Sequence, residues 1–232
     1  MEQTTLKYLR ILIPGLIFYL GFYPIFKYYF GDVYDIKSLD FSFVTVISIL
    51  IGGIYYQLNF QYLITSFSLK KINNNIFDHL VRAYGKDINQ YQKNELKQRH
   101  MTVFYRIIDN DESLKKKANN VYFNGIFWTS SADFFLFGLV FWVIYRFIFS
   151  DVDDSRLFSD LFLSLAVLSI FLHVISVRKH ITLSNDQLRF IDVHKKKEVT
   201  EYFDNILQQL PKHSIEEGSE GNKPSKKRIL KR

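Results

Sequence analysis

The sequence contains no cysteine among its 232 residues. A chain without cysteine has no disulfide framework, no thiolate-bound metal and no cysteine nucleophile. Charge is almost absent from four long stretches, residues 11–26, 41–69, 121–145 and 157–177. No motif in the chain names a reaction, so we expect no enzyme, with no catalytic residue, no metal site and no cofactor.

The four uncharged stretches are long enough to cross a membrane as helices. The hydrocarbon core of a bilayer is about 30 Å thick, so a spanning helix needs about 20 mostly apolar residues. Arg10 and Lys27 flank the first stretch, and their long side chains can reach the headgroups. We therefore predict an all-α integral membrane protein with four transmembrane helices, at about 11–30, 41–62, 126–149 and 157–177.

The alternative is a soluble all-helical protein with unusually apolar core helices. The mean hydropathy of −0.03 favours that alternative only as an average. It combines the four apolar stretches with two very polar blocks, residues 70–120 and 178–232. Such a mixture is typical of a membrane protein with extensions in water, and we prefer that interpretation.

Lysine and arginine are distributed unevenly between the connections. The 61–120 connection holds eleven basic residues and the segment after residue 177 holds thirteen, whereas each short connection holds two. Because basic residues concentrate on the cytoplasmic side, we predict a multi-pass protein of the cell inner (plasma) membrane with both termini cytoplasmic. The first stretch shows no small-residue cleavage pattern, so we expect it to be retained. The net charge of +7 then reflects topology and attraction to anionic lipids, which we prefer to nucleic-acid binding.

These patterns divide the chain into two helical hairpins with cytoplasmic additions. The predicted segments are a first transmembrane hairpin at 1–69, a helical loop at 70–120, a second hairpin at 121–180, a cytoplasmic helix at 181–210 and a disordered basic tail at 211–232. Basic residues at the membrane ends of the second hairpin are expected to anchor the topology by contact with anionic lipid. They are Lys115, Lys116, Lys117, Arg178 and Lys179.

Apolar residues in the cytoplasmic loop recur with a helical period. Ile72, Ile76, Leu80 and Tyr84 are four residues apart, and asparagines 73–75, between the first two of them, can cap a helix start. The pattern predicts an amphipathic helix. Its apolar face must lie against the membrane surface, a neighbouring helix or another subunit.

Three further helices follow from the same reasoning. We expect one from about Asn89 to Ile108, one from near Asp111 into the third span, and one from Ser184 to Leu210. A helix with an apolar face needs a partner. We therefore expect a cytoplasmic protein to bind through the 70–120 loop and the 181–210 helix.

Polar residues within the spans are expected at one depth in the inner leaflet. Counted from Phe149 and Leu157, Asp133 and His173 each lie 16 residues from the outer end of their span, roughly 24 Å by helical rise. The predicted layer consists of Gln57, Asn59, Thr129, Ser130, Asp133 and His173. A charged side chain at mid-membrane costs about 2.5–3.5 kcal/mol, so Asp133 needs a partner, and we expect His173 in that role. The pair is either a gate or sensor, since histidine titrates near physiological pH, or a structural hydrogen bond.

Two short patterns carry less information. Arg189 and His194 have the spacing seen in HEPN-type RNases, but the usual polar residue after the arginine is missing, and we attribute the match to chance. Gly52 and Gly53 interrupt the second span without the GxxxG spacing. A notch for helix packing is the better interpretation than a ligand site.

The overall plan resembles the small four-span membrane effectors of prokaryotic anti-phage and CRISPR-associated systems, such as the KwaA component of Kiwa. The resemblance rests on the run ILIPGLIFYLGFYPIF and the run FVTVISILIGGIYYQLNF as a first hairpin, on the basic helical loop, and on the second aromatic-rich hairpin. It covers residues 1–180 in outline and transfers no catalytic motif. It implies an inner-membrane homo-oligomer that senses infection or perturbs the membrane, with membrane lipids as its surroundings.

Three functions therefore compete. The first is a membrane effector or sensor in anti-phage defence that acts by membrane perturbation or pore formation. The second is a small ion channel or transporter with Asp133 and His173 lining its path. The third is a membrane-anchored nuclease that uses Arg189 and His194. Because a four-helix monomer encloses little room, any pore requires several subunits.

Overall fold

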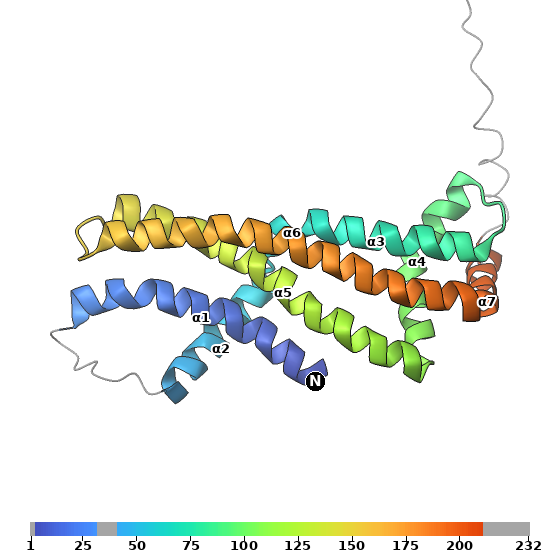
Figure 1. The fold of residues 1–232 in the computed structure, drawn as a ribbon, viewed down its shortest axis with the longest axis horizontal. Coiled ribbons are helices and arrows are strands. Elements are labelled where there is room, and N and C mark those ends of the chain that lie inside the picture. Colours follow the sequence, from blue (N-terminus) through green and yellow to red (C-terminus); the bar gives the residue numbers. More distant parts are fainter. Residues whose placement is uncertain (1–2, 32–40, 211–232) are drawn as a thin grey trace, which may run out of the picture. The chain divides into compact units, whose positions relative to one another are not determined.

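A computed structural model describes residues 3–31 and 41–210, and all regular structure within these ranges is helical (Figure 1). The all-α class is thereby confirmed. The chain divides into two compact units. Unit 1 consists of Met1–Ile72 and Lys116–Ser184, and unit 2 consists of Asn73–Lys115 and Asn185–Arg232.

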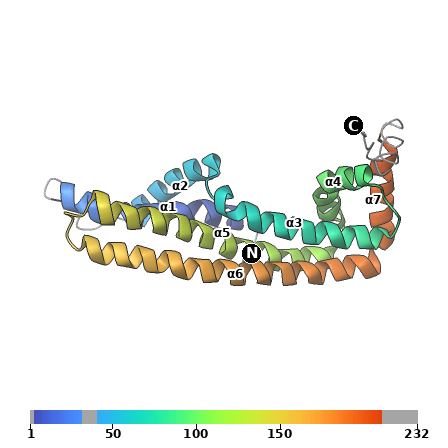
Figure 2. The ribbon, with the colours of Figure 1, turned by 90° about the horizontal axis from the view of Figure 1, so that it is seen from above.

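Unit 1 contains most of the apolar helices. They are α1 (Gln3–Phe30), α2 (Phe41–Leu58), the start of α3 (Tyr62–Tyr84), most of α5 (Glu112–Val143), the π-helical turn η1 (Ile144–Ile148) and most of α6 (Ser155–His194). Helices α5 and α6 run side by side in both views (Figures 1 and 2). The Asn124 side chain links them by donating a hydrogen bond to the Ser176 carbonyl oxygen at 2.9 Å.

Three of these helices are long and apolar enough to cross a membrane by themselves, and they lie at Thr5–Phe30, Glu112–Ile148 and Ser155–His194. A fourth candidate is the pair Ser42–Leu58 and Tyr62–Tyr84, which is bent by 62° at a short break. The described residues thus contain three to four candidate spans, consistent with a multi-pass membrane protein.

The second span differs from the predicted continuous helix at 41–62, because α2 ends at Leu58. At the break, Asn59 has a φ of 54°, in the left-handed region that asparagine tolerates better than most residues. The Asn59 carbonyl oxygen then accepts a hydrogen bond from the Tyr62 amide at 3.0 Å. A local turn therefore replaces the helical bonds that a straight span would have formed.

Helices α1 and α2 pack at van der Waals contact of their backbones. A Cβ atom added to Gly15 would lie 1.8 Å from the Ser48 carbonyl oxygen, and one added to Gly52 would lie 1.8 Å from the Ile11 carbonyl oxygen. A Cβ atom added to Gly53 would have no other atom within 4 Å. The predicted packing notch is confirmed at Gly52.

The core of unit 1 is built largely from aromatic rings. Phe141 and Tyr145 are almost fully buried, and the Tyr145 ring stacks on Phe162 with centroids 5.8 Å apart. The Tyr145 hydroxyl donates a hydrogen bond to the Gly21 carbonyl oxygen at 2.7 Å, so its polar end is satisfied. These contacts join α1 to η1 and α6.

Unit 2 combines α4 (Gln90–Asp109) and α7 (Lys196–Gln208) with the ends of α3, α5 and α6. Helix α4 packs against α7, as Figure 2 shows. The predicted apolar face of α3 is buried here, with Leu80 fully inaccessible and Tyr84 in ring contact with Phe203. The sequence left the membrane surface, a neighbouring helix or another subunit as the cover for that face. The structure shows that neighbouring helices cover it.

Two predicted helix starts are wrong. Helix α3 continues through asparagines 73–75, and α6 continues through Ser184 to His194 before a break at Lys195. The reason is a polar contact inside unit 2, in which the Asn75 amide donates to the Asn185 side-chain oxygen at 2.7 Å. These asparagines, which resemble helix caps in the sequence, instead form a hydrogen bond between two helices. Residues 32–40, in the connection between the first two predicted spans, and the 211–232 tail lie outside the described residues.

Candidate functional site

Asp133 lies on α5 and is 2 % exposed. Its side-chain oxygen accepts a hydrogen bond from the Tyr55 hydroxyl of α2 at 2.8 Å, and Tyr55 is itself 7 % exposed. A buried carboxyl group of this kind needs a partner, since leaving it unpaired costs free energy. The partner comes from α2, so this contact ties α2 to α5.

His173 lies on α6 at a meeting point of three helices. Its Nε2 is 2.8 Å from the Ser68 hydroxyl of α3, and its Nδ1 is 3.0 Å from the Trp128 carbonyl oxygen and 3.1 Å from the Ser131 hydroxyl of α5. Because a carbonyl oxygen only accepts, Nδ1 carries the hydrogen, and in the neutral ring Nε2 accepts from Ser68. We call these four residues, Ser68, Trp128, Ser131 and His173, the His173 node.

The predicted pairing of Asp133 with His173 is therefore corrected. The two residues have different partners, since Asp133 bonds to α2 whereas His173 bonds to α3 and its own neighbour α5. A depth estimate gives the height of a residue along the span. It does not give the direction in which its side chain leaves the helix.

The other members of the predicted layer lie apart. The Thr129 hydroxyl donates within its own helix to the Gly125 carbonyl oxygen at 2.9 Å. Ser130 lines an apolar groove, and Gln57 and Asn59 are exposed at the end of α2. Among the described residues, Asp133 and His173 thus take part in two separate polar contacts, and neither contact includes another member of the predicted layer.

Sequence reasoning missed Tyr55, Ser68 and Ser131. Ser131 follows the predicted Ser130 directly, so the run of polar residues before Asp133 was an available signal. Tyr55 and Ser68 carry no such signal, because one lies within an aromatic run and the other within an uncharged stretch. Their roles follow from the bend between α2 and α3.

The predicted anchor residues Lys115, Lys116, Lys117, Arg178 and Lys179 are all exposed. Their contact with anionic lipid stays a prediction.

Arg189 and His194 are also exposed, and both lie on α6. Five residues along an α-helix correspond to a rotation of about 140°, so the two side chains leave different faces. The His194 ring packs on Phe190 with centroids 4.6 Å apart. The spacing therefore does not bring the pair to one point on this helix.

Unit 2 carries a polar groove of about 800 Å³ between α4 and α7. Arg99 and Arg106 line one side, and Glu201 and Tyr202 line the other. The Arg106 guanidinium lies over the Tyr202 ring at 5.0 Å from its centroid. The groove offers charged groups of both signs to water.

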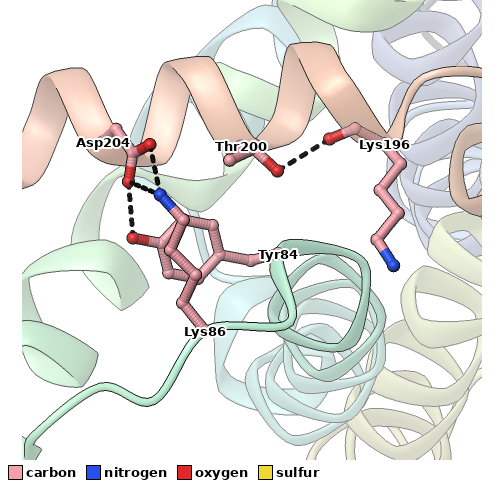
Figure 3. A network of polar contacts seen from close by, with 5 residues as sticks. All are labelled: Tyr84, Lys86, Lys196, Thr200 and Asp204. Atoms are coloured by element: carbon pink, nitrogen blue, oxygen red, sulfur yellow. Dashed lines mark hydrogen bonds and ion pairs between the residues drawn. The ribbon is translucent and has the colours of Figure 1, made fainter.

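A second polar network closes the end of α3 against α7 (Figure 3). The Tyr84 hydroxyl donates to Asp204 at 2.7 Å, and the Lys86 ammonium contacts both Asp204 oxygens at 2.8 and 2.6 Å. Gly85 between them has a φ of 67°, which glycine adopts without strain and which turns the chain at the helix end. The hydrogen bonds from Lys86 and then Tyr84 lower the pKa of Asp204 below its usual value.

Replacement of Asp204 by asparagine is expected to destabilise unit 2 slightly at neutral pH. The pair is partly exposed, so the effect is roughly 0.2–1 kcal/mol. Since the folded-state pKa is lowered, the ionised carboxylate stabilises the fold fully above pH 3.8, and this contribution is lost as the pH falls through the lower folded value. Thermal unfolding of the two proteins from pH 7 to pH 3 measures it. A constant difference across that range would contradict the role of the charge.

Among the described residues, no group of three or more His, Cys, Asp or Glu side chains could hold a metal ion. No family model, curated protein or solved structure matches this chain.

Proposed function

We propose that the chain is an inner-membrane sensor and effector of anti-phage defence, which acts as a homo-oligomer by perturbing the membrane. Unit 2 receives the signal in the cytoplasm, through a protein or ligand bound at its polar groove. Unit 1 responds within the bilayer. The defensive role itself rests on the resemblance in plan to four-span membrane effectors.

One structural observation supports the coupling of the two units. Helices α3, α5 and α6 each belong partly to unit 1 and partly to unit 2, without a break at the boundary. The His173 node joins these same three helices inside unit 1. A displacement of any one of them strains the hydrogen bonds to the other two, so the node is suited to pass a change between units.

Asp133 has a structural role in this proposal. Its carboxyl group is buried and bonded to Tyr55, and the grooves nearby are lined almost wholly by apolar side chains. An ion path through one protomer would need polar walls at this level. This arrangement favours a lock between the hairpins over a gate.

The proposal is tested by phage infection of cells that express the chain, with a dye that reports membrane potential. We expect infection to depolarise these cells and phage plating to fall. Ser68→Ala removes only the α3 bond of the His173 node and is expected to weaken the response. Asp133→Asn keeps an oxygen that accepts from Tyr55 and is expected to respond as the unchanged chain does.

Each outcome tests a separate part of the proposal. Unchanged membrane potential and unchanged plating would contradict the defensive role. A full response from Ser68→Ala at equal expression would contradict coupling through the node. Loss of the response in Asp133→Asn at equal expression would instead favour a charge-dependent gate.

A further inference from the structure

Three buried polar groups without hydrogen-bond partners gather at one end of unit 1. They are Nε of Arg10 on α1, Nε1 of Trp128 on α5 and Nδ1 of His180 on α6. Such atoms are rare in folded proteins because each lost hydrogen bond costs free energy. Three such atoms in one place make this end of unit 1 a candidate binding site.

The three side chains are close to one another. A Cβ atom on Gly125 would lie 2.9 Å from an Arg10 guanidinium nitrogen and 3.9 Å from Trp128 Nε1, so both donors lie over the same glycine. The centroids of the Trp128 and His180 rings are 6.0 Å apart, and the rings pack edge to face. Arg10 is also near enough to His180 for its charge to act on the imidazole.

This cluster is cationic and rich in donors. A guanidinium group and an indole N–H only donate hydrogen bonds, and His180 Nδ1 donates in the tautomer that carries its hydrogen. Among the described residues, Arg10 forms no ion pair with a carboxylate. Trp128 is only 6 % exposed, so its N–H is held in place by packing and cannot turn to water. The partner that satisfies these groups is an anion, and a phosphate matches the fork of arginine best.

An apolar groove begins beside the cluster. It has a volume of about 470 Å³, within the range of small-molecule sites. Ile13 lies one turn beyond Arg10, and Ile126 and Phe127 lie between Gly125 and Trp128. From there α1, α5 and α6 line the groove, with Leu16 and Leu20 on α1 among the exposed side chains.

We propose that unit 1 binds one anionic phospholipid, whose phosphate is held by Arg10, Trp128 and His180 and whose acyl chain lies in the groove of α1, α5 and α6. The polar cluster alone would fit any phosphate, and the groove alone would fit any apolar chain. Only a lipid carries both groups at adjacent positions. This inference rests on membrane insertion and does not depend on the defensive role.

The test is native mass spectrometry of the full chain in detergent, titrated with phosphatidylglycerol. Phosphatidylcholine with the same acyl chains and inorganic phosphate are titrated separately. We expect one phosphatidylglycerol to bind more tightly than either of the other two, because the Arg10 guanidinium repels the choline cation of phosphatidylcholine and inorganic phosphate has no acyl chain to lie in the groove. Arg10→Gln is expected to weaken that binding about tenfold or more, because it removes a charged hydrogen bond. Lys7→Gln removes the same charge from an exposed position one turn earlier and is expected to change it less than twofold.

Two further variants keep the result decisive. Trp128→Phe keeps the ring packing and removes the donor, so it is expected to weaken binding even if Arg10→Gln does not fold. Leu16→Trp fills the groove and is expected to weaken lipid binding without affecting inorganic phosphate.

Three results would overturn the proposal. If Arg10→Gln and Lys7→Gln weakened phosphatidylglycerol binding equally, the lipid would be attracted by the general positive charge and not by this site. Inorganic phosphate that binds as tightly as the lipid would identify a free anion. Oxidative cross-linking between copies of a Leu20→Cys variant, in a chain without other cysteines, would show that a second protomer fills the groove.

Discussion

Replacement of Gly52 by alanine is expected to destabilise the protein, whereas the same replacement at the adjacent Gly53 is not. The new Cβ at Gly52 would lie 1.8 Å from the Ile11 carbonyl oxygen, and a backbone atom cannot move aside without moving α1. Overpacking of this kind costs about 1–3 kcal/mol or more. At Gly53 nothing lies within 4 Å, so alanine there gains about 0.5–1 kcal/mol from its helix preference.

The measurement is the unfolding temperature of each variant in the same detergent, together with elution volume as a check on folding. Gly15→Ala, which would place a Cβ atom 1.8 Å from the Ser48 carbonyl oxygen, is expected to behave as Gly52→Ala does. If Gly52→Ala and Gly53→Ala unfolded at the same temperature, α1 and α2 would not pack as described.

Replacement of Tyr55 by phenylalanine is expected to cost about 1–3 kcal/mol, because it leaves the buried Asp133 carboxyl group without its hydrogen bond. This exceeds the average of about 0.6 kcal/mol for hydrogen bonds between membrane helices. The excess arises because the group left behind is an acid and is 2 % exposed. A typical pair leaves a neutral group that finds another partner.

A double variant separates the bond from the burial. Tyr55→Phe with Asp133→Leu removes both polar groups, and replacing both partners by apolar groups is often nearly neutral. We therefore expect the double variant to be more stable than Tyr55→Phe alone. Unfolding temperatures of the two single variants, the double variant and the unchanged chain complete the cycle. Additive losses would mean that the two side chains do not interact.

The helices could be predicted from the sequence wherever one periodic pattern runs between clear signals. Asn89 caps α4 through a reciprocal contact with Gln92, and both residues are visible in the sequence as a capping pattern. The apolar face of α3 follows from its spacing alone, and the structure buries it. The uncharged stretches indicate the candidate spans in the same way, because length and composition are local properties.

The break after Leu58 could not be predicted, because no proline, glycine or charge marks it. The run LNFQY continues an apolar stretch, and the turn depends on the φ of Asn59. The hydrogen-bond partners of Asp133 and His173 could not be predicted from the sequence either. They depend on the bend, which leaves Tyr55 on one helix and Ser68 on the next. Asn75 and Asn185 show the opposite error, since residues typical of caps serve a contact between distant segments.

The composition of unit 2 has a consequence for synthesis. Its two parts, Asn73–Lys115 and Asn185–Arg232, are separated along the chain by the segment Lys116–Ser184 of unit 1. At about 5–20 residues per second, the ribosome needs several seconds to make the intervening part. During that time the apolar faces of α3 and α4 stay uncovered, because α7 has not yet been made. A chaperone or the translocation machinery is therefore expected to shield them. Truncation before Lys196 should therefore yield a chain that inserts but is degraded from its water-exposed side.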